Sequence, residues 1–367
     1  MLSSKLTVKK MKLLFINTKK NWGGIVNLSS ILMQTLAADG IESFNAVSIQ
    51  RIGSFSLPAP VINLSLSYGF NYNPLAIFTL AKLIRKHKIE FVIVNITKEI
   101  IFGGIAARLC GIKCVRLVGN ELDFERHHFL NTHFVDLNIH PSHYTLRETK
   151  QRYSYTKKLN HDVIHCGTED RQISIADKQA EYKRLQLSPT HFIIGCTGRI
   201  VEDKGVHTLI KAFALLKDKI PEAVLVINGK GEYLTELQQL IKTHELGDRV
   251  RAQGFAPDCL TAASIYDVAV MPSRLEGFPN TLIEYLSLGK AVVSTPVGGI
   301  PEAIEDKVNG LIFPVDDAGA LAECILLVAQ NAVLKKALEA NARSSYLARF
   351  TASAMATAFL TLLKGNK

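Results

Sequence analysis

Residues 271–301 read MPSRLEGFPNTLIEYLSLGKAVVSTPVGGIP, and this stretch decides how the rest of the chain is interpreted. It contains two carboxylates, Glu276 and Glu284, and a helical apolar pattern that begins just after Pro279. Proline suits the first turn of a helix, where its missing N–H group has no intrahelical partner to lose. We therefore expect Glu276 on a loop and Glu284 more than one turn into a helix.

The start of this predicted helix is suited to an anion, because exposed N–H groups and the helix dipole would form a seat for a diphosphate. A carboxylate repels phosphate but accepts hydrogen bonds from hydroxyl groups, so the two glutamates indicate a ribose and a sugar on either side of it. A ribose, a diphosphate and a sugar in this order are the parts of a nucleotide sugar. The residues predicted to bind the donor on this stretch are Gly277, Phe278, Pro279, Asn280, Thr281, Leu282 and Glu284.

A second candidate element is the turn at residues 198–205, GRIVEDKG, between a predicted strand and a predicted helix. Ligands bind at the carboxyl ends of strands in open parallel sheets. Arg199 and Lys204 would neutralise a diphosphate there and stabilise it as a leaving group. The alternative is that both cations form surface ion pairs with Glu202 and Asp203, which would contribute little.

Strand and helix patterns alternate along the chain in two series, which predicts two parallel sheets and an α/β fold. The first series has strands at 12–17, 46–49, 61–64, 91–94, 114–118, 135–139 and 163–167, and helices at 26–38, 74–87 and 102–110. The second has strands at 191–197, 224–228, 250–253, 268–271, 291–294 and 310–313, and helices at 233–242, 318–329, 332–345 and 352–363. Between the series, residues 168–189 are polar, with a short helix near 180–185, and are predicted to be a linker.

Composition is that of a globular protein of 367 residues, with 47% hydrophobic and 21% charged residues. The sequence has no apolar run long enough for a transmembrane helix, and the opening residues do not form a signal peptide, so we expect a cytoplasmic protein. Translation starts at Met1 or Met11. The six cysteines lack metal-binding spacing and are expected to be free thiols.

The net charge of +10 is uneven, with +11 in residues 1–167 and −1 in residues 168–367. The basic half, which includes Arg85, Lys86 and Lys88, suits an anionic partner such as phospholipid headgroups or phosphorylated saccharide. A solvated positive face without a specific partner is the alternative. A nucleic-acid partner is not predicted, because no recognition helix or aromatic platform accompanies the charge.

Gly23 and Gly24 precede a helical pattern and form a second candidate loop. Glycines at a helix start let a ligand approach the backbone closely, although paired glycines also occur in plain turns. Neither this loop nor any other shows the G-x-G-x-x-G pattern of a nicotinamide dehydrogenase, and we expect no cofactor.

The segments GRIVEDKGVHTLIKAF, VINGKGE, PSRLEGFPNTLIEYLSLGKAVVSTPVGGIPEAI and NGLIF closely resemble the C-terminal domain of retaining glycosyltransferase family four, the glycosyl transferases group 1. The resemblance is strongest over residues 191–315. It implies the GT-B fold, two Rossmann-like domains facing across a cleft, and sugar transfer with retention and without a metal. It also implies an acceptor domain at 1–167, a donor domain at 168–350, and a terminal helix at 351–367 that packs back on the first domain.

On this likeness Arg199 and Lys204 would hold the diphosphate, with Gly198 beside them, while Glu276 would hold the donor sugar and Glu284 the ribose. These implied catalytic residues are Arg199, Lys204 and Glu276. The first half resembles the family less, in the loop at Gly23 and Gly24 and in VIHCGTED at residues 163–170.

One departure concerns the first domain, where many members carry a histidine after the strand that corresponds to residues 114–118. This chain reads RLVGNELDFE at residues 116–125, so Asn120, Glu121 or Arg116 would have to replace it. The acidic residues of this segment alternate as on an exposed loop or strand face, and no metal site is predicted.

The predicted function is transfer of a sugar from a UDP-, GDP- or ADP-sugar to a saccharide or lipid-linked acceptor, in bacterial envelope polysaccharide or lipopolysaccharide biosynthesis. Peripheral association with the inner face of the cell membrane fits the basic first half. The alternatives are a nucleotide-sugar epimerase of similar fold and a non-catalytic sugar-nucleotide-binding protein.

Overall fold

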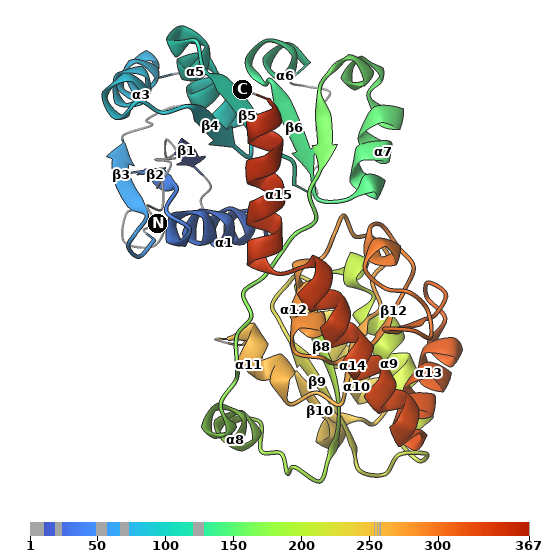
Figure 1. The fold of residues 1–367 in the computed structure, drawn as a ribbon. Helices are drawn as coiled ribbons and strands as arrows, with labels where there is room; N and C mark the ends of the chain where they lie inside the picture. Colours follow the sequence, from blue (N-terminus) through green and yellow to red (C-terminus); the bar gives the residue numbers. More distant parts are fainter. Residues whose placement is uncertain are drawn as a thin grey trace, which may run out of the picture. The chain divides into compact units, whose positions relative to one another are not determined.

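The computed structural model describes residues 11–18, 24–48, 57–66, 73–119, 128–252, 254, 256 and 258–366. The chain divides into two compact units, Met1–Gly167 with Ala352–Lys367, and Thr168–Thr351. Each unit is built around one parallel sheet with helices on its faces (Figure 1), so the predicted α/β fold is confirmed.

The sheet of the first unit has seven strands in the order β3-β2-β1-β4-β5-β6-β7. The strand order reverses between β1 and β4, which is the type of position where open α/β sheets bind ligands. The strands are β1 (Lys12–Asn17), β2 (Glu42–Ser48), β3 (Ile62–Leu66), β4 (Phe91–Val94), β5 (Lys113–Leu117), β6 (Leu137–His140) and β7 (His161–Val163).

Helices cover both faces of this sheet because side chains along each strand point alternately to opposite sides. Leu13 and Phe15 of β1 pack with α1 and α15 on one face. Leu14 and Ile16 pack with α3 and α5 on the other. The helices are α1 (Gly24–Ala38), α3 (Pro74–His87), α4 (Thr97–Glu99), the π-helix η2 (Ile100–Gly104), α5 (Ile105–Cys110), α6 (His128–Phe134), α7 (His143–Arg152), the 3-10 helix η4 (Ser154–Lys158) and α15 (Ala352–Gly365).

The sheet of the second unit has six strands in the order β10-β9-β8-β11-β12-β13. The strands are β8 (Phe192–Thr197), β9 (Ala223–Asn228), β10 (Val250–Ala252), β11 (Val268–Met271), β12 (Ala291–Ser294) and β13 (Leu311–Ile312). The helices are α8 (Ile175–Arg184), η5 (Glu202–Lys204), α9 (Val206–Leu216), α10 (Leu234–Thr243), η6 (Gly247–Arg249), α11 (Cys259–Ser264), α12 (Asn280–Ser287), η7 (Ile300–Glu302), α13 (Ala318–Gln330) and α14 (Ala332–Arg349).

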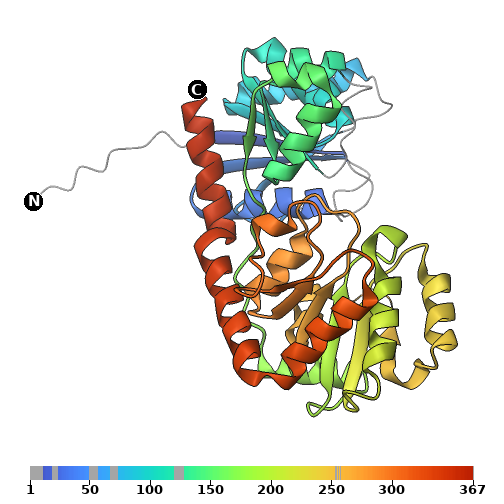
Figure 2. The same cartoon turned by 90° about the vertical axis from the view of Figure 1, so that its right-hand side faces the viewer.

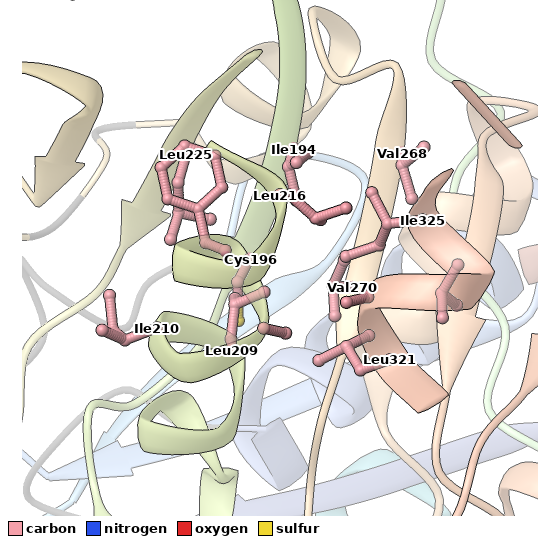
Figure 3. Close-up of a cluster of buried hydrophobic side chains, with 14 of the residues drawn as sticks. Ile194, Cys196, Leu209, Ile210, Leu216, Leu225, Val268, Val270, Leu321 and Ile325 are labelled. Atoms are coloured by element: carbon pink, nitrogen blue, oxygen red, sulfur yellow. The ribbon is translucent and has the colours of Figure 1, made fainter. Parts of the chain in front are cut away.

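The core of the second unit lies between this sheet and helices α9 and α13 (Figure 3). Leu209 and Leu216 of α9 and Ile325 of α13 are fully buried against the strands. Strands of the second unit lie between two layers of helices (Figure 2), with α12 and α14 packed on each other and on β12. Because the strands are buried on both faces, their register in the sheet is fixed. The position at which each following loop begins is therefore fixed as well.

Several predicted boundaries are wrong. The strand expected at 163–167 lies at His161–Val163, and the helix expected to begin at residue 102 begins at Thr97 and contains a π-turn. Helices α6 and α7 were not predicted, since α7 buries only the polar Thr145 and Thr149 and so lacks an apolar stripe. Residues 168–189 are not a linker, because they belong to the second unit, where α8 packs on α11.

All six cysteines are free, as predicted, and Cys114, Cys166 and Cys196 are buried. Within the described residues, no single helix is both long and apolar enough to cross a membrane. Helices α13 and α14 meet that test only when taken together, and they are bent by 101° at the break between them.

Candidate active site

The first turn of α12 lies at the carboxyl edge of the second sheet. Pro279 precedes the helix as its N-cap, with an extended backbone (φ −77°, ψ 123°), one position earlier than predicted. The N–H group of Leu282 donates to the carbonyl of Pro279 at 3.1 Å, so it is not available to a ligand. The predicted seat of three amides is therefore wrong in this detail, because the Leu282 N–H group is engaged within the helix.

Two of the predicted catalytic residues contact each other. Lys204 Nζ lies 2.5 Å from Glu276 Oε1, and the hydroxyl of Ser273 donates to the same oxygen at 2.8 Å. Glu276 is only 4% exposed, so these two donors replace water as its hydrogen-bond partners. The alternative in which Lys204 pairs with Glu202 or Asp203 is wrong.

Glycines bring the loops of this edge into direct backbone contact. Gly205 (φ +65°) lies so close to the Pro272 carbonyl that a Cβ there would be 1.8 Å from the oxygen. Gly298 (φ +62°) approaches the Glu276 carbonyl equally closely. No side chain could replace hydrogen at either position without moving backbone, so the loops after β8, β11 and β12 are held in one arrangement.

Arg274 connects the loop after β11 to the loops after β8 and β13. Its guanidinium donates to both carboxylate oxygens of Asp316 and to Glu202, all at 2.9 Å. Its N–H group donates to the carbonyl of Asp203 at 2.8 Å. Sequence reasoning missed this cluster because its members lie 42 and 72 positions apart.

Glu284 occupies the second turn of α12, as predicted. Burial, and to a smaller extent the negative charge of Asp258, raises the pKa of its carboxyl group to about 7. Asp258 itself caps α11 and pairs with Arg171, so it stays ionised and keeps its effect on Glu284. A hydrogen-bond donor from a ligand would favour the ionised form of Glu284.

Arg199 and Gly198 follow β8 directly. The Arg199 side chain is exposed, and no ion pair involves it in the described part of the chain. A Cβ built at Gly198 would meet no protein atom within 4 Å, and its backbone does not need positive φ. The fold therefore does not by itself require glycine at this position, in contrast to Gly205 and Gly298.

Below these loops, polar side chains fix the ends of the strands. The hydroxyl of Tyr285 accepts the N–H of Thr197 at 2.8 Å, and the hydroxyl of Tyr266 contacts the Thr197 hydroxyl at 2.9 Å. Asn228, at the end of β9, donates to Tyr266 at 2.5 Å. Burial raises the pKa of Tyr266, so its hydroxyl stays protonated. The carboxyl ends of β8 and β9 are thereby joined to α12.

In the first unit, the predicted acceptor residues are only partly placed. Gly24 begins α1, whereas Gly23 and Asn120 lie outside the described residues. Arg116, a possible substitute for the family's histidine, is 5% exposed and donates to Asn131 of α6 at 2.7 Å. It is therefore bound within its own unit.

A buried carboxylate that sequence reasoning missed marks the switch point of the first sheet. Glu99 is 1% exposed and accepts from the N–H groups of Thr18 at 2.8 Å and Asn95 at 2.7 Å. Burial raises the pKa of Glu99, while these hydrogen bonds oppose the rise. Ser29 of α1 donates to Asn95 at 2.9 Å, so the ends of β1 and β4 and helix α1 are connected.

A small apolar cavity of about 20 Å³ also lies in the first unit, between α1, α15 and the ends of β5 and β6. It has room for about one water molecule, far less than a nucleotide needs. No group of three His, Cys, Asp or Glu side chains in the described residues could hold a metal ion.

The family model of glycosyl transferases group 1 matches residues 177–345. The chain is 25% identical over 299 residues to the UDP-Gal:alpha-D-GlcNAc-diphosphoundecaprenol alpha-1,3-galactosyltransferase of Escherichia coli. This alignment covers 77% of this chain and 76% of that protein. The chain is also 32% identical over 171 residues to the lipopolysaccharide core biosynthesis glycosyltransferase LpsE of Rhizobium meliloti. This alignment covers 47% of this chain and 49% of LpsE.

The aligned region thus spans about half of LpsE and about three quarters of the galactosyltransferase. Among solved structures, Anabaena Alr3699/HepE in complex with UDP is similar with a TM-score of 0.80 at 21% identity, over 97% of this chain and 100% of that one. Together with the two parallel sheets, this likeness confirms the predicted GT-B fold of two Rossmann-like domains.

Proposed function

Since the family model of glycosyl transferases group 1 matches residues 177–345, we propose that this chain is a retaining glycosyltransferase of that family. It moves a sugar from a nucleotide-diphosphate donor to a saccharide or lipid-linked acceptor. The names of two relatives support this choice, since one acts on a diphosphoundecaprenol-linked sugar and the other in lipopolysaccharide core biosynthesis. We assign the reaction to bacterial envelope polysaccharide or lipopolysaccharide biosynthesis.

The contact of Lys204 with Glu276 is the observation that carries the proposal. It places a cation and a carboxylate from different loops together just before the start of α12. Ion pairs at a surface contribute little, and a buried one is hard to justify by stability alone. A site that must hold both a diphosphate and sugar hydroxyl groups needs both charges next to each other.

In the proposed complex the diphosphate binds Lys204, Arg199 and the first turn of α12. Glu276 accepts hydrogen bonds from the donor sugar, and Glu284 accepts them from the ribose. Gly198 supports this arrangement. The fold has space for a side chain at this position, and a ligand that approaches the backbone closely would explain why the residue is glycine.

The chemical step breaks the bond between the anomeric carbon and the diphosphate oxygen, and forms a bond from that carbon to the acceptor oxygen on the same face. The acceptor proton passes to the departing diphosphate oxygen. Lys204 and Arg199 stabilise the negative charge that grows on this oxygen, and no metal is required for that purpose. Closing the site excludes water and so limits hydrolysis of the donor.

The second unit, residues 168–350, is proposed to bind the donor, because it carries all the residues just named. The first unit, residues 1–167 with the helix at 351–367, is proposed to bind the acceptor through the loop at Gly23 and Gly24. The reaction is assigned to the cytoplasmic face of the cell membrane, where nucleotide sugars and lipid-linked saccharides meet.

Thermal shift against UDP-, GDP- and ADP-sugars is the first test, because a ligand that binds only the folded protein raises its melting temperature by an amount set by affinity and concentration. One nucleotide class should stabilise the wild type and fail to stabilise Lys204→Ala. The same donor is then incubated with and without saccharide acceptors, and the anomeric configuration of the product is read by NMR.

Retention and dependence on acceptor support the proposal. A donor that is isomerised without acceptor would establish the epimerase instead. Tight binding with neither transfer nor hydrolysis would establish a sugar-nucleotide-binding protein. Equal stabilisation of Lys204→Ala and wild type would remove Lys204 from the donor site.

A further inference from the structure

Four of the five bulky apolar side chains exposed in the described part of the first unit lie on helices α3, α5 and α6, and the fifth is Ile62 of β3. Helices α3, α5 and α6 all pack on the same face of the sheet, opposite to α1 and α15. On their outer sides, Leu75 and Phe78 of α3 are 74% and 65% exposed, Leu109 of α5 is 51% exposed and Phe129 of α6 is 63% exposed. Bulky apolar groups that cluster in this way mark an interaction surface.

Basic residues lie among these apolar side chains. Lys82, Arg85 and Lys86 are exposed on α3, and Arg108 is exposed on α5. None of the three helices contains an aspartate or a glutamate. Cations in the last turns of α3 and α5 also stabilise those helices, and Arg108 is one of them. Lys82 lies outside both turns, so helix stabilisation does not explain the whole set.

The three helices form one continuous surface. Arg85 donates to the Leu109 carbonyl at 3.0 Å, and Arg108 donates to the His133 carbonyl at 2.5 Å. Helices α3 and α5 lie side by side (Figure 1). We call this the α3–α6 surface, formed by Leu75, Phe78, Lys82, Arg85, Lys86, Arg108, Leu109 and Phe129.

We propose that the α3–α6 surface docks on a bilayer that contains anionic phospholipids. The apolar side chains enter the boundary between headgroups and acyl chains, and the lysines and arginines face the lipid phosphates. The inference deepens the proposed function and rests on it in one respect, because a lipid-linked acceptor lies at such a bilayer.

A second basic stretch of the same unit provides a comparison. Lys157 and Lys158 of η4 are exposed, but none of the bulky apolar residues exposed in the described part of the first unit lies on η4 or on α7. This stretch has charge without apolar groups, so it should be attracted to the membrane from solution without entering it. It therefore supplies a control with the same number of charges.

Flotation of the full chain with vesicles tests the proposal at two lipid compositions, pure phosphatidylcholine and a mixture with about one third phosphatidylglycerol. The wild type should bind the anionic vesicles at least tenfold more strongly. Lys82→Gln with Lys86→Gln should reduce that binding about twenty-five-fold, since each basic side chain near an anionic surface contributes about fivefold. Arg85 is left intact because it holds the end of α5.

The apolar part of the surface is tested with Leu75→Ser and Phe78→Ser together, which should reduce binding to anionic vesicles tenfold or more. The control Lys157→Gln with Lys158→Gln should change binding less than twofold. Melting curves of all variants show whether each is folded.

Three results would overturn the proposal: equal binding of the wild type to both kinds of vesicle, an equal loss in the control, or self-association in light scattering that Phe78→Ser abolishes. Failure of the proposed function is recognised separately, because donor binding is measured without vesicles. A chain that binds vesicles but no nucleotide sugar would keep the docking surface and lose the transferase.

Discussion

In the second unit, the loops after β8, β11 and β12 are held together by backbone contacts at Gly205 and Gly298, whereas in the first unit the chain after β1 is held by one buried carboxylate, Glu99. The first arrangement depends on glycines and on a short motif that is visible in the sequence. The second depends on a polar network between distant segments. The difference supports the proposal that the second unit binds a ligand of fixed shape, the nucleotide sugar.

The buried carboxylates of the two units differ in the same way. In the second unit, Glu276 forms an ion pair with Lys204, and we propose that both side chains contact the donor when it binds. In the first unit, the described residues that donate to Glu99 do so through neutral groups. We therefore expect substitutions in the second unit to change turnover and donor affinity, and substitutions at Glu99 to change stability.

The largest effect is expected for Lys204→Ala. It removes a preorganised cation from the leaving group and should lower turnover about a hundredfold or more. Steady-state kinetics with the donor chosen by thermal shift measures it. Lys211→Ala, which removes an exposed lysine of α9, is the matched control and should retain wild-type turnover.

Lys204→Ala also leaves Glu276 buried without its cation, which destabilises the fold. The double variant Lys204→Met with Glu276→Gln removes both charges and should recover the melting temperature but not the turnover. If the double variant were as active as the wild type, the ion pair would be only structural, and the contrast between the two units would disappear.

Glu284→Gln is expected to have the next largest effect. A carboxyl group whose pKa is raised to about 7 in the folded protein reduces stability as pH rises from about 4.5 through 7. The neutral variant avoids this loss, so at pH 8 it should be more stable in the absence of donor by up to about 3 kcal/mol. Urea unfolding measures this difference.

The same comparison at pH 5 is an internal control, because the folded wild type is then protonated and the difference should fall below about 1 kcal/mol. Donor affinity should decrease about tenfold in the variant, since an amide is a weaker acceptor for hydroxyl groups than a carboxylate. A variant less stable than the wild type at pH 8 would contradict the assigned cause.

Local signals explain which parts of the fold were predictable. Strand β4 and helix α3 end at the predicted residues, since β4 is a short apolar run and α3 has Asn73 as N-cap, Pro74 after it and a left-handed residue, Lys88, at its end. By contrast, β7 is a three-residue polar strand that exists because it pairs with β6 at the sheet edge. No local pattern distinguishes it.

The candidate site divides along the same line. Lys204, Glu276 and Glu284 could be predicted as candidates because each belongs to a motif of a few residues. Arg274 and Glu99 were missed because their partners lie far along the chain, with 81 positions between Glu99 and Thr18. A network of this kind is formed by tertiary packing, and a single sequence contains no record of the pairing.

Glu99→Gln tests the other side of the comparison. An amide NH₂ group would face N–H donors where the carboxylate accepts, so the variant should lose about 1–3 kcal/mol of stability. Donor affinity, measured by calorimetry, should stay within twofold, because the donor is proposed to bind in the second unit. The control is Glu148→Gln on α7, where the carboxylate is only partly buried. Loss of donor affinity in Glu99→Gln would show that the two sheet edges do not act separately.

The smallest effect is expected for Arg274→Ala, which removes an exposed residue that positions the loop of Lys204 from outside. Exposed ion pairs contribute at most about 1 kcal/mol, so the melting temperature should hardly change. Turnover should fall roughly fivefold with little change in donor KM, because Lys204 would be less precisely held at the leaving group. Arg274→Lys should recover part of the rate.

The control is Lys335→Ala, which breaks a similar ion pair with Asp267 at the opposite edge of the same sheet and should leave turnover unchanged. If Arg274→Ala altered only the melting temperature, the cluster around Arg274 would stabilise the fold without positioning Lys204, and the backbone contacts at Gly205 and Gly298 would suffice to hold the site.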